Sequence, residues 1–160
     1  MPAIFNLGRF VTAQEPVLEQ VRAELKAGSK QSHWMWFVFP QIAGLGSSDK
    51  AQHFAIASVE EASSYLEHSV LGPRLLEFTG LVNAVKNKSA RQIFGAPDDQ
   101  KFHASMTLFA SAKPDEQAFS DALSSYFGGT RHQLTLERIA AQAGTSADKS
   151  RSRLTYVQKK

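Results

Sequence analysis

The sequence predicts an all-α fold: a single multihelical domain in an irregular array of about seven or eight helices. Apolar residues recur at the three- and four-residue spacing of amphipathic helices through most of the chain. Sustained alternation of apolar and polar residues, which would indicate strands, is absent from the sequence. Prolines and serines stand where the apolar periodicity begins, and glycines stand where it ends.

The size and composition fit one ordinary globular domain, with 160 residues, 42% of them hydrophobic and 21% charged. There is no cysteine, which excludes disulfides, thiolate zinc sites and a cysteine nucleophile. The first residues show no signal peptide, and the longest apolar run, Trp34–Phe39, is far shorter than the roughly 20 residues that span a bilayer. We therefore expect a cytoplasmic protein that does not enter a membrane.

The basic residues are concentrated at the C-terminal end. Residues 145–160 carry a net charge of +4, and because the whole chain carries +3, the body of residues 1–144 is left at −1. We therefore expect residues 1–144 to form the globular domain and residues 145–160 to form a basic, flexible tail. A body without excess positive charge argues against nucleic acid as a partner, except through the tail.

In the first part of the chain, helices are expected over Leu7–Ala13 and Pro16–Ala27. They are separate because proline is tolerated in the first turn of a helix but not in its interior. The segment His33–Phe39 is almost wholly apolar and short enough for a strand or a helical turn. Ser32 as N-cap favours a short helix there. A glycine-rich loop follows at Gly44–Ser48.

The remaining helices are indicated by capping residues and apolar faces. Ser58 and Glu61 have the spacing of a capping box, and Pro73 suits a first helical turn. Asp98 or Asp99 can cap the helix that follows them. The expected helices cover Asp49–Ala57, Ser58–Leu66, Pro73–Val85, Ser89–Gly95, Lys101–Ala110, Asp115–Phe127 and Leu134–Ala143.

The first candidate site is the aromatic segment from Lys30 to Gln41. Trp34 and Trp36 could stack on a planar ligand while Lys30 and Gln41 contact its polar groups. Among these aromatic residues, His33 could serve as a general acid or base near neutral pH. The alternative is a dense core segment in which His33 bonds only a backbone carbonyl.

The second candidate site follows the turn at Asp98 and Asp99. In a helix, Lys101 and Ser105 lie four residues apart on one face, which could border a polar pocket, and Thr107 adds another hydroxyl. The alternatives are that the aspartates only cap the helix and that the hydroxyls bond backbone carbonyls one turn earlier. The five histidines lack the spacing of a metal site and no phosphate-binding glycine loop is present, so we expect no metal and no cofactor.

Several segments of the chain together resemble the DUF1810 family, a bacterial domain family without an assigned function. The block His33–Gln41 is the most specific of them, and the resemblance runs from Leu7 to Leu136. The other matching segments are Arg9–Gln14, Gly44–Ser47, Glu61–Ala62, Tyr65–Leu66, Val70–Arg74, Phe94–Gly95, Pro97–Asp99 with Lys101, and Ser105–Phe109.

This resemblance implies an all-α, multihelical single domain but carries over no settled activity. Some members are labelled calpastatin, but the animal inhibitor of that name is a long disordered repeat protein, unlike a compact aromatic-rich domain. The chain departs from the family's usual pattern at three positions, with Phe102 in place of a basic residue, Ala104 in place of a serine and His132 in place of an aspartate. Chemistry that depends on those polar groups would be incomplete here.

Three hypotheses for the function remain open. The first is binding of a small polar or planar ligand in a cleft between residues 30–41 and 97–105. The second is an enzyme of unassigned reaction, in which His33 is the acid–base group and Asp98 or Asp99 orients it. The third is a protein-interaction module that uses exposed aromatic side chains. The sequence does not give the oligomeric state.

Overall fold

The computed structural model describes residues 5–151, and for residues 144–151 it describes the backbone alone. Its helices are α1 (Gly8–Gln14), the 3-10 turn Glu15–Val17, α2 (Leu18–Ala27), α3 (Met35–Val38), α4 (Asp49–His53), α5 (Val59–Glu67), α6 (Leu71–Asn83), α7 (Ala90–Phe94), α8 (Asp98–Ala112), α9 (Gln117–Phe127) and α10 (Gln133–Arg151). Within the described residues there is no strand, only one isolated parallel bridge between Ile42 and Ile56. The prediction of an all-α, multihelical domain is confirmed. None of the helices in this part of the chain is long and apolar enough to cross a membrane.

The boundaries of α2 and α3 follow from local chemistry. Gly28 ends α2 with a φ of 68°, a left-handed conformation that glycine adopts without a steric penalty. Helix α3 begins after Trp34 and not at the predicted N-cap, Ser32. The Ser32 hydroxyl donates a hydrogen bond to the Glu24 carboxylate at 2.6 Å, so it serves another partner.

Helices α4 and α8 also begin or end away from the predicted positions. Helix α4 ends at His53 and not at Ala57, because the Ile56 N–H turns away to bond a carbonyl in the preceding loop. Helix α8 begins at Asp98, so both aspartates lie inside its first turn and do not precede it. Negative charge is favourable there because it faces the positive end of the helix dipole.

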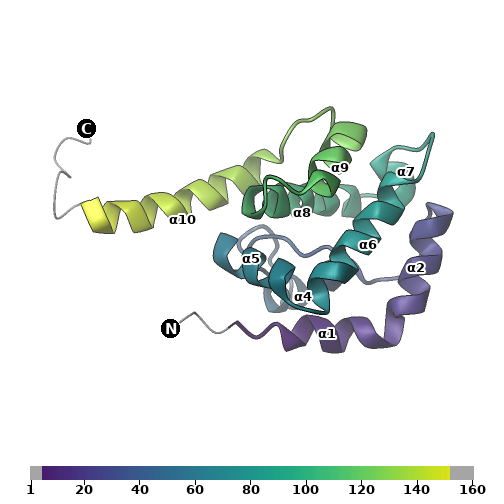
Figure 1. The fold of residues 1–160 in the computed structure, drawn as a ribbon, viewed down its shortest axis with the longest axis horizontal. Helices are drawn as coiled ribbons and strands as arrows, with labels where there is room; N and C mark the ends of the chain where they lie inside the picture. The colour runs from purple at the N-terminus through teal and green to yellow at the C-terminus, as the bar shows by residue number, and fades with distance from the viewer. Residues whose placement is uncertain (1–4, 152–160) are drawn as a thin grey trace.

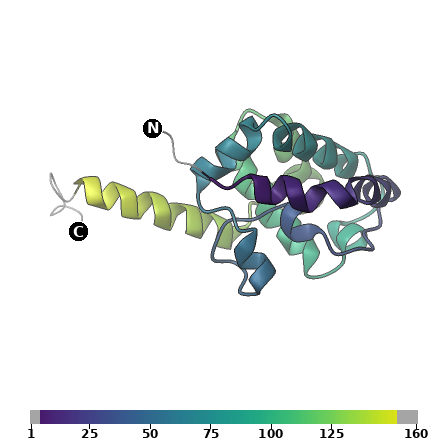
Figure 2. The same ribbon diagram turned by 90° about the horizontal axis from the view of Figure 1, so that it is seen from below.

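Helix α10 is longer than predicted. It runs from Gln133 to Arg151, whereas the apolar periodicity predicts an end at Ala143. The expected boundary between domain and tail, at residues 144 and 145, therefore falls inside α10, and residues 152–160 of the expected tail lie outside the described residues. In Figures 1 and 2 the C-terminal half of α10 extends away from the rest of the molecule.

Helix α8 lies at the centre of the molecule and packs against α3, α5, α7, α9 and α10 (Figure 1). Its Phe102 ring lies 5.0 Å from that of Phe39, and its Phe109 ring lies 5.3 Å from that of Tyr65. Full burial of a side chain of this size stabilises the fold by roughly 1.5–3 kcal/mol. Phe102 and Ala104 are both fully buried, so the apolar residues at these two positions serve core packing.

A set of polar motif residues, three of them buried and two half-buried, lies between α1, α5 and α6. Arg9 pairs with the Glu61 carboxylate at 3.0 Å and also donates to three backbone carbonyls. The Gln14 amide donates to the Tyr65 hydroxyl at 3.2 Å, and Arg74 donates to the Gln14 carbonyl oxygen at 3.2 Å. We refer to Arg9, Gln14, Glu61, Tyr65 and Arg74 as the buried polar network, which ties these three helices together.

Candidate ligand-binding hollow

The aromatic segment is held in place by a buried carboxylate of α2. Glu24 accepts hydrogen bonds at 2.6–3.1 Å from the backbone N–H groups of Gln31 and Ser32, the Ser32 hydroxyl and the Trp34 indole N–H. Burial by itself raises the pKa of this carboxyl, but the four hydrogen bonds outweigh burial and lower the pKa to about 2. Trp34 is only 1% exposed, so its ring supports the fold and offers no face to a ligand.

Two contacts join the aromatic segment to the start of α8. Lys30 pairs with Asp98 at 2.8 Å, and only 6% of the Lys30 side chain is exposed. The Lys101 ammonium lies 3.5 Å from the other Asp98 oxygen and 5.2 Å from the centre of the Trp36 ring. The segments 30–41 and 97–105 are therefore neighbours in the fold.

An open hollow of about 420 Å³ lies beside this junction. Its walls come from the loop before α4, the first turn of α8 and the first turn of α10. We call this space the hollow; it is lined by Gln41, residues 45–48, Ala51, Pro97, Gln100, Lys101, His132 and Leu134. The lining combines apolar surface with a few amide, hydroxyl, ammonium and imidazole groups, a mixture typical of small-ligand sites.

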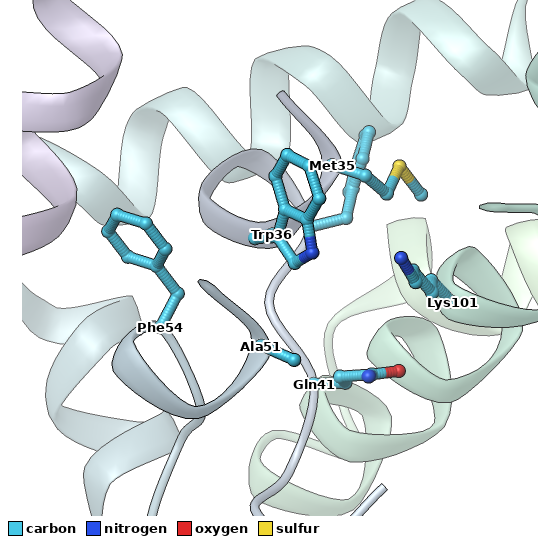
Figure 3. Close-up of a pocket in the computed structure, with 7 residues that line it drawn as sticks. Met35, Trp36, Gln41, Ala51, Phe54 and Lys101 are labelled. Carbon is cyan, nitrogen blue, oxygen red and sulfur yellow. The ribbon is translucent and has the colours of Figure 1, made fainter. Parts of the chain in front are cut away.

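A smaller recess adjoins the hollow and shares Gln41, Ala51 and Lys101 with it. The recess has a volume of about 10 Å³, which is room for about one water molecule. Figure 3 shows Trp36 and Lys101 facing each other across it, with Gln41 and Ala51 below them. Trp36 is half-buried, so part of its indole is open to solvent at the edge of the recess.

The loop in front of the hollow is held by α10. Gly44 has a φ of 100°, and a Cβ at this position would lie 2.5 Å from the guanidinium of Arg138. The positive φ favours glycine at this position, because a residue with a Cβ is strained in this backbone conformation. The Arg138 Nε also donates to the Ala43 carbonyl at 3.3 Å. Helix α10 thus positions residues 45–48 along the edge of the hollow.

His132 lines the hollow and also caps α10. Its Nδ1 lies 2.9 Å from the Thr135 hydroxyl oxygen and accepts the Thr135 backbone N–H at 3.3 Å, as a capping side chain does in the first turn of a helix. Burial, and to a smaller extent the neighbouring His103, lower the pKa of His132 and so favour the neutral ring that this cap requires.

The predicted binding residues divide between the hollow and the core. Those at the hollow or the recess are Trp36, Gln41 and Lys101. Those in the core are Trp34, Ser105 and Thr107, each no more than 1% exposed. The Lys30 side chain, 6% exposed, lines neither space and pairs with Asp98. Ser105 Oγ has no hydrogen-bond partner in the described part of the chain, and Thr107 Oγ1 accepts the His132 backbone N–H at 2.9 Å. These core positions do not fit contact with a ligand in the hollow, because this side of α8 faces the other helices.

The predicted acid–base pair is not assembled in the structure. His33 is exposed, and among the described residues no hydrogen bond or ion pair joins it to Asp98 or Asp99. Asp98 pairs instead with Lys30 and Lys101. Asp99 has one buried carboxylate oxygen without a hydrogen-bond partner in the same part of the chain. Neither Asp98 nor Asp99 therefore orients the His33 imidazole.

Sequence reasoning did not identify Lys50, Gln100 and Leu134 as residues of this region. The Lys50 ammonium lies 5.0 Å from the centre of the Trp36 ring, and Gln100 and Leu134 line the hollow. Nothing in the sequence distinguishes these three from other exposed helix residues. The loop Gly44–Ser47 did carry a signal, because it belongs to the family resemblance and lies outside the apolar blocks of the core.

The chain is similar to one protein family and to one solved structure. A family model described as "Protein of unknown function (DUF1810)" matches residues 4–139. The crystal structure of the conserved hypothetical protein Rv1873 from Mycobacterium tuberculosis is 54% identical in sequence and has a TM-score of 0.84. That match covers 85% of this chain and 97% of the other. None of the curated proteins compared with the chain matches it.

Proposed function

This chain belongs to the DUF1810 family, and we propose that it binds a small polar ligand in the hollow between the starts of α4, α8 and α10. The volume of about 420 Å³ supports this function, because ligand sites usually enclose roughly 300–1,000 Å³. The lining comes from three separate elements that the fold holds in fixed positions. A ligand would therefore meet a largely preformed site.

The proposal depends on one observation above the others: a half-buried indole and an ammonium group meet at the recess that adjoins a space of ligand size. Trp36 supplies apolar area at a small conformational cost, since only two side-chain torsions have to be fixed. Lys101 supplies a charged donor that orients the ligand. Gln41 and Gln100 add amide groups that can donate or accept.

The two other hypotheses have less support. An enzyme that uses His33 would need a group to orient the imidazole, and Asp98, one of the two predicted partners, is engaged by two lysines. A protein-interaction surface would need a contiguous apolar patch. Among the described residues, Leu76 and Leu134 are the large hydrophobic side chains that count as exposed, at 37% and 57%. Two such residues do not make a patch of that kind.

The test is a thermal-unfolding screen of small metabolites on the wild-type chain and on Gln100→Trp. Gln100 is exposed in the first turn of α8, so a larger side chain there fills the hollow without removing a core contact. A ligand at 100 times its Kd adds about 2.7 kcal/mol. For a chain of this size that raises Tm by roughly 5–10 °C. We expect at least one ligand to stabilise the wild type and to leave Gln100→Trp unchanged.

The matched control is Gln117→Trp, which places the same side chain at another exposed glutamine in the first turn of a helix, α9. It should respond to ligands as the wild type does. The proposal fails if no compound raises Tm. It also fails if every stabilising compound acts equally on the wild type and on Gln100→Trp, since binding would then lie outside the hollow.

A further inference from the structure

Two lysines from different helices meet on the same indole ring. The Lys50 ammonium of α4 lies 5.0 Å from the centre of the Trp36 ring, and the Lys101 ammonium of α8 lies 5.2 Å from it. A cation–π contact at a partly exposed site contributes only about 0.5–1 kcal/mol. An ammonium group has three donors, so the ring leaves most of the hydrogen-bonding capacity of both lysines unused.

The negative charge around these lysines does not balance them. In the described part of the chain, Lys101 has one ion pair, at 3.5 Å to Asp98, and Lys50 has none. Asp98 is shared, because its other oxygen holds Lys30 at 2.8 Å. Asp49, the neighbour of Lys50 in sequence, is exposed and lies within 4 Å of neither lysine's ammonium. Lys30 and Lys101 therefore share one carboxylate, and Lys50 adds a third positive charge without an ion pair in the described residues.

Lys30 differs from Lys50 and Lys101 in its exposure and in its partners within the protein. Its side chain is 6% exposed, and besides Asp98 it donates to the Ser32 carbonyl. Lys30 is therefore satisfied within the protein and helps to hold the aromatic segment. Lys101 is 25% exposed and lines the hollow, and Lys50 is exposed and precedes Ala51, which also lines it. The unbalanced charge therefore lies on the solvent side.

We infer that the ligand of the hollow is an anion whose carboxylate or phosphate group binds between Lys50 and Lys101 beside Trp36. This inference rests on the function proposed above and adds the chemical class of the ligand: a small organic acid or a phosphate ester. The acid group accepts charge-assisted hydrogen bonds from the two ammonium groups. The remainder of the molecule occupies the hollow, where Gln41, Gln100 and the neutral His132 ring provide polar contacts.

The inference is tested with two probes, inorganic phosphate and benzoate, titrated at constant ionic strength while the tryptophan fluorescence of the full chain is recorded. Saturation by either probe supports the inference and identifies the acid group that the site accepts. Lys50→Gln and Lys101→Gln should each weaken binding by about tenfold or more, because each removes a charged donor. Lys86→Gln is the matched control, since Lys86 is an exposed lysine with no ion pair in the described residues. It should bind as the wild type does.

A second pair of variants changes charge without removing a lysine. Leu134 is 57% exposed in the first turn of α10 and lines the hollow. Leu134→Glu and Leu134→Gln are nearly equal in size, and an acidic residue is favourable at the start of a helix. Weaker binding of both probes to Leu134→Glu than to Leu134→Gln is the expected result. Equal binding to the two variants would contradict an anion in this space.

The outcomes separate this inference from the proposed function. No saturation by either probe up to about 50 mM, or equal affinity in the wild type and the lysine variants, overturns the inference. In a second outcome, neutral ligands bind the wild type and the double variant Lys50→Gln/Lys101→Gln equally well but do not bind Gln100→Trp. The hollow then remains a ligand site, and the inference that its ligand is an anion is rejected. If the probes bind Gln100→Trp as well as the wild type but not the lysine variants, the anion site stands and the hollow is rejected.

Discussion

The buried polar network and the hollow use polar side chains in opposite ways. In the network, Arg9 and Glu61 have only 13% and 3% of their side chains exposed, and each of the five members bonds another member. In the hollow, the Gln41 and Gln100 side chains make no hydrogen bond within the described residues. Paired polar groups stabilise the fold, whereas unpaired groups facing an open space are available to a ligand.

This difference explains what the family resemblance can and cannot predict. All five members of the buried polar network belong to the motifs on which the resemblance depends, yet their partners are other groups of the protein. The polar motif residues therefore predict the architecture, which the structure confirms. Function has to be argued from the hollow, where several of the residues lie outside those motifs.

The largest effect is expected from breaking the network at its buried ion pair. Arg9→Met leaves the Glu61 carboxylate buried without its partner and removes four hydrogen bonds. We expect the free energy of unfolding, measured by urea denaturation, to fall by about 3–5 kcal/mol. The control is Arg22→Met, which removes two ion pairs with the more exposed Glu19 and Glu77 and should cost about 1 kcal/mol or less. Similar losses in the two variants would show that the network is not a special source of stability.

A slightly smaller effect is expected at the carboxylate that supports the aromatic segment. The pKa of Glu24 falls to about 2 in the folded chain from an ordinary value of 4.5, so the unfolded chain binds the proton more tightly. Glu24 therefore contributes its full stability above about pH 4.5, and this contribution is lost as the pH falls through about 2. It amounts to roughly 3 kcal/mol.

Glu24→Gln is the variant that tests this. It should be less stable than the wild type at pH 7, and the difference should shrink as the pH approaches 2. Urea denaturation of both proteins across the range from pH 7 to pH 2 measures it. A constant difference at all pH values would mean that the hydrogen bonds to Gln31, Ser32 and Trp34 do not depend on the charge of Glu24.

The fold could be predicted because helices leave local signals. Pro16, Ser58 and Gly28 mark helix ends by their backbone or capping chemistry, which depends on near neighbours alone. The boundary at Ser32 was wrong because a residue eight positions away, Glu24, takes its hydroxyl. The end of α4 was wrong because the Ile56 bridge to the preceding loop competes with the helix. Both errors come from tertiary partners.

The candidate site could be predicted only in part, for the same physical reason. Trp36, Gln41 and Lys101 stand in notable segments and lie at the hollow or the recess. Trp34 stands in the same segment but is turned to the core by its bond to Glu24. Lys50 reaches Trp36 through the arrangement of α3 and α4. Which of these two tryptophans, two positions apart, faces outward depends on the packing of distant elements, and periodicity does not record it.

A smaller effect, about 1 kcal/mol, is expected at His132, which belongs to both kinds of region because it caps α10 and lines the hollow. Its pKa is lower in the folded chain than the ordinary value of 6.5. The cap therefore contributes fully above pH 6.5, and its contribution is lost as the pH falls through the lower folded pKa. His132→Ala should lose this stability at pH 8.

His132→Asp sharpens the test, because aspartate is a preferred cap and stays ionised through this range. It should be as stable as the wild type at pH 8 and more stable at pH 5.5 in urea denaturation. The control is His33→Ala, since His33 is exposed and makes no hydrogen bond within the described chain. If the wild type and His132→Asp respond identically to pH, the imidazole does not cap the helix.

The smallest effect on stability is expected at the hollow itself. Lys50→Gln and Lys101→Gln should change the free energy of unfolding by no more than about 0.5 kcal/mol each. They should nevertheless change how ionic quenchers reduce the tryptophan fluorescence. Quenching reports on Trp36, because Trp34 is 1% exposed and hidden from quenchers.

The expected size of the quenching effect follows from the charge of one lysine. A unit charge about 5–6 Å away shifts local ion concentrations by about twofold at moderate salt. Iodide should therefore quench each variant about twofold less than the wild type and caesium correspondingly more, while the neutral quencher acrylamide stays unchanged. Equal iodide and caesium quenching in all three proteins would mean that the lysines create no positive potential at Trp36, and the contrast with the fully paired network would then disappear.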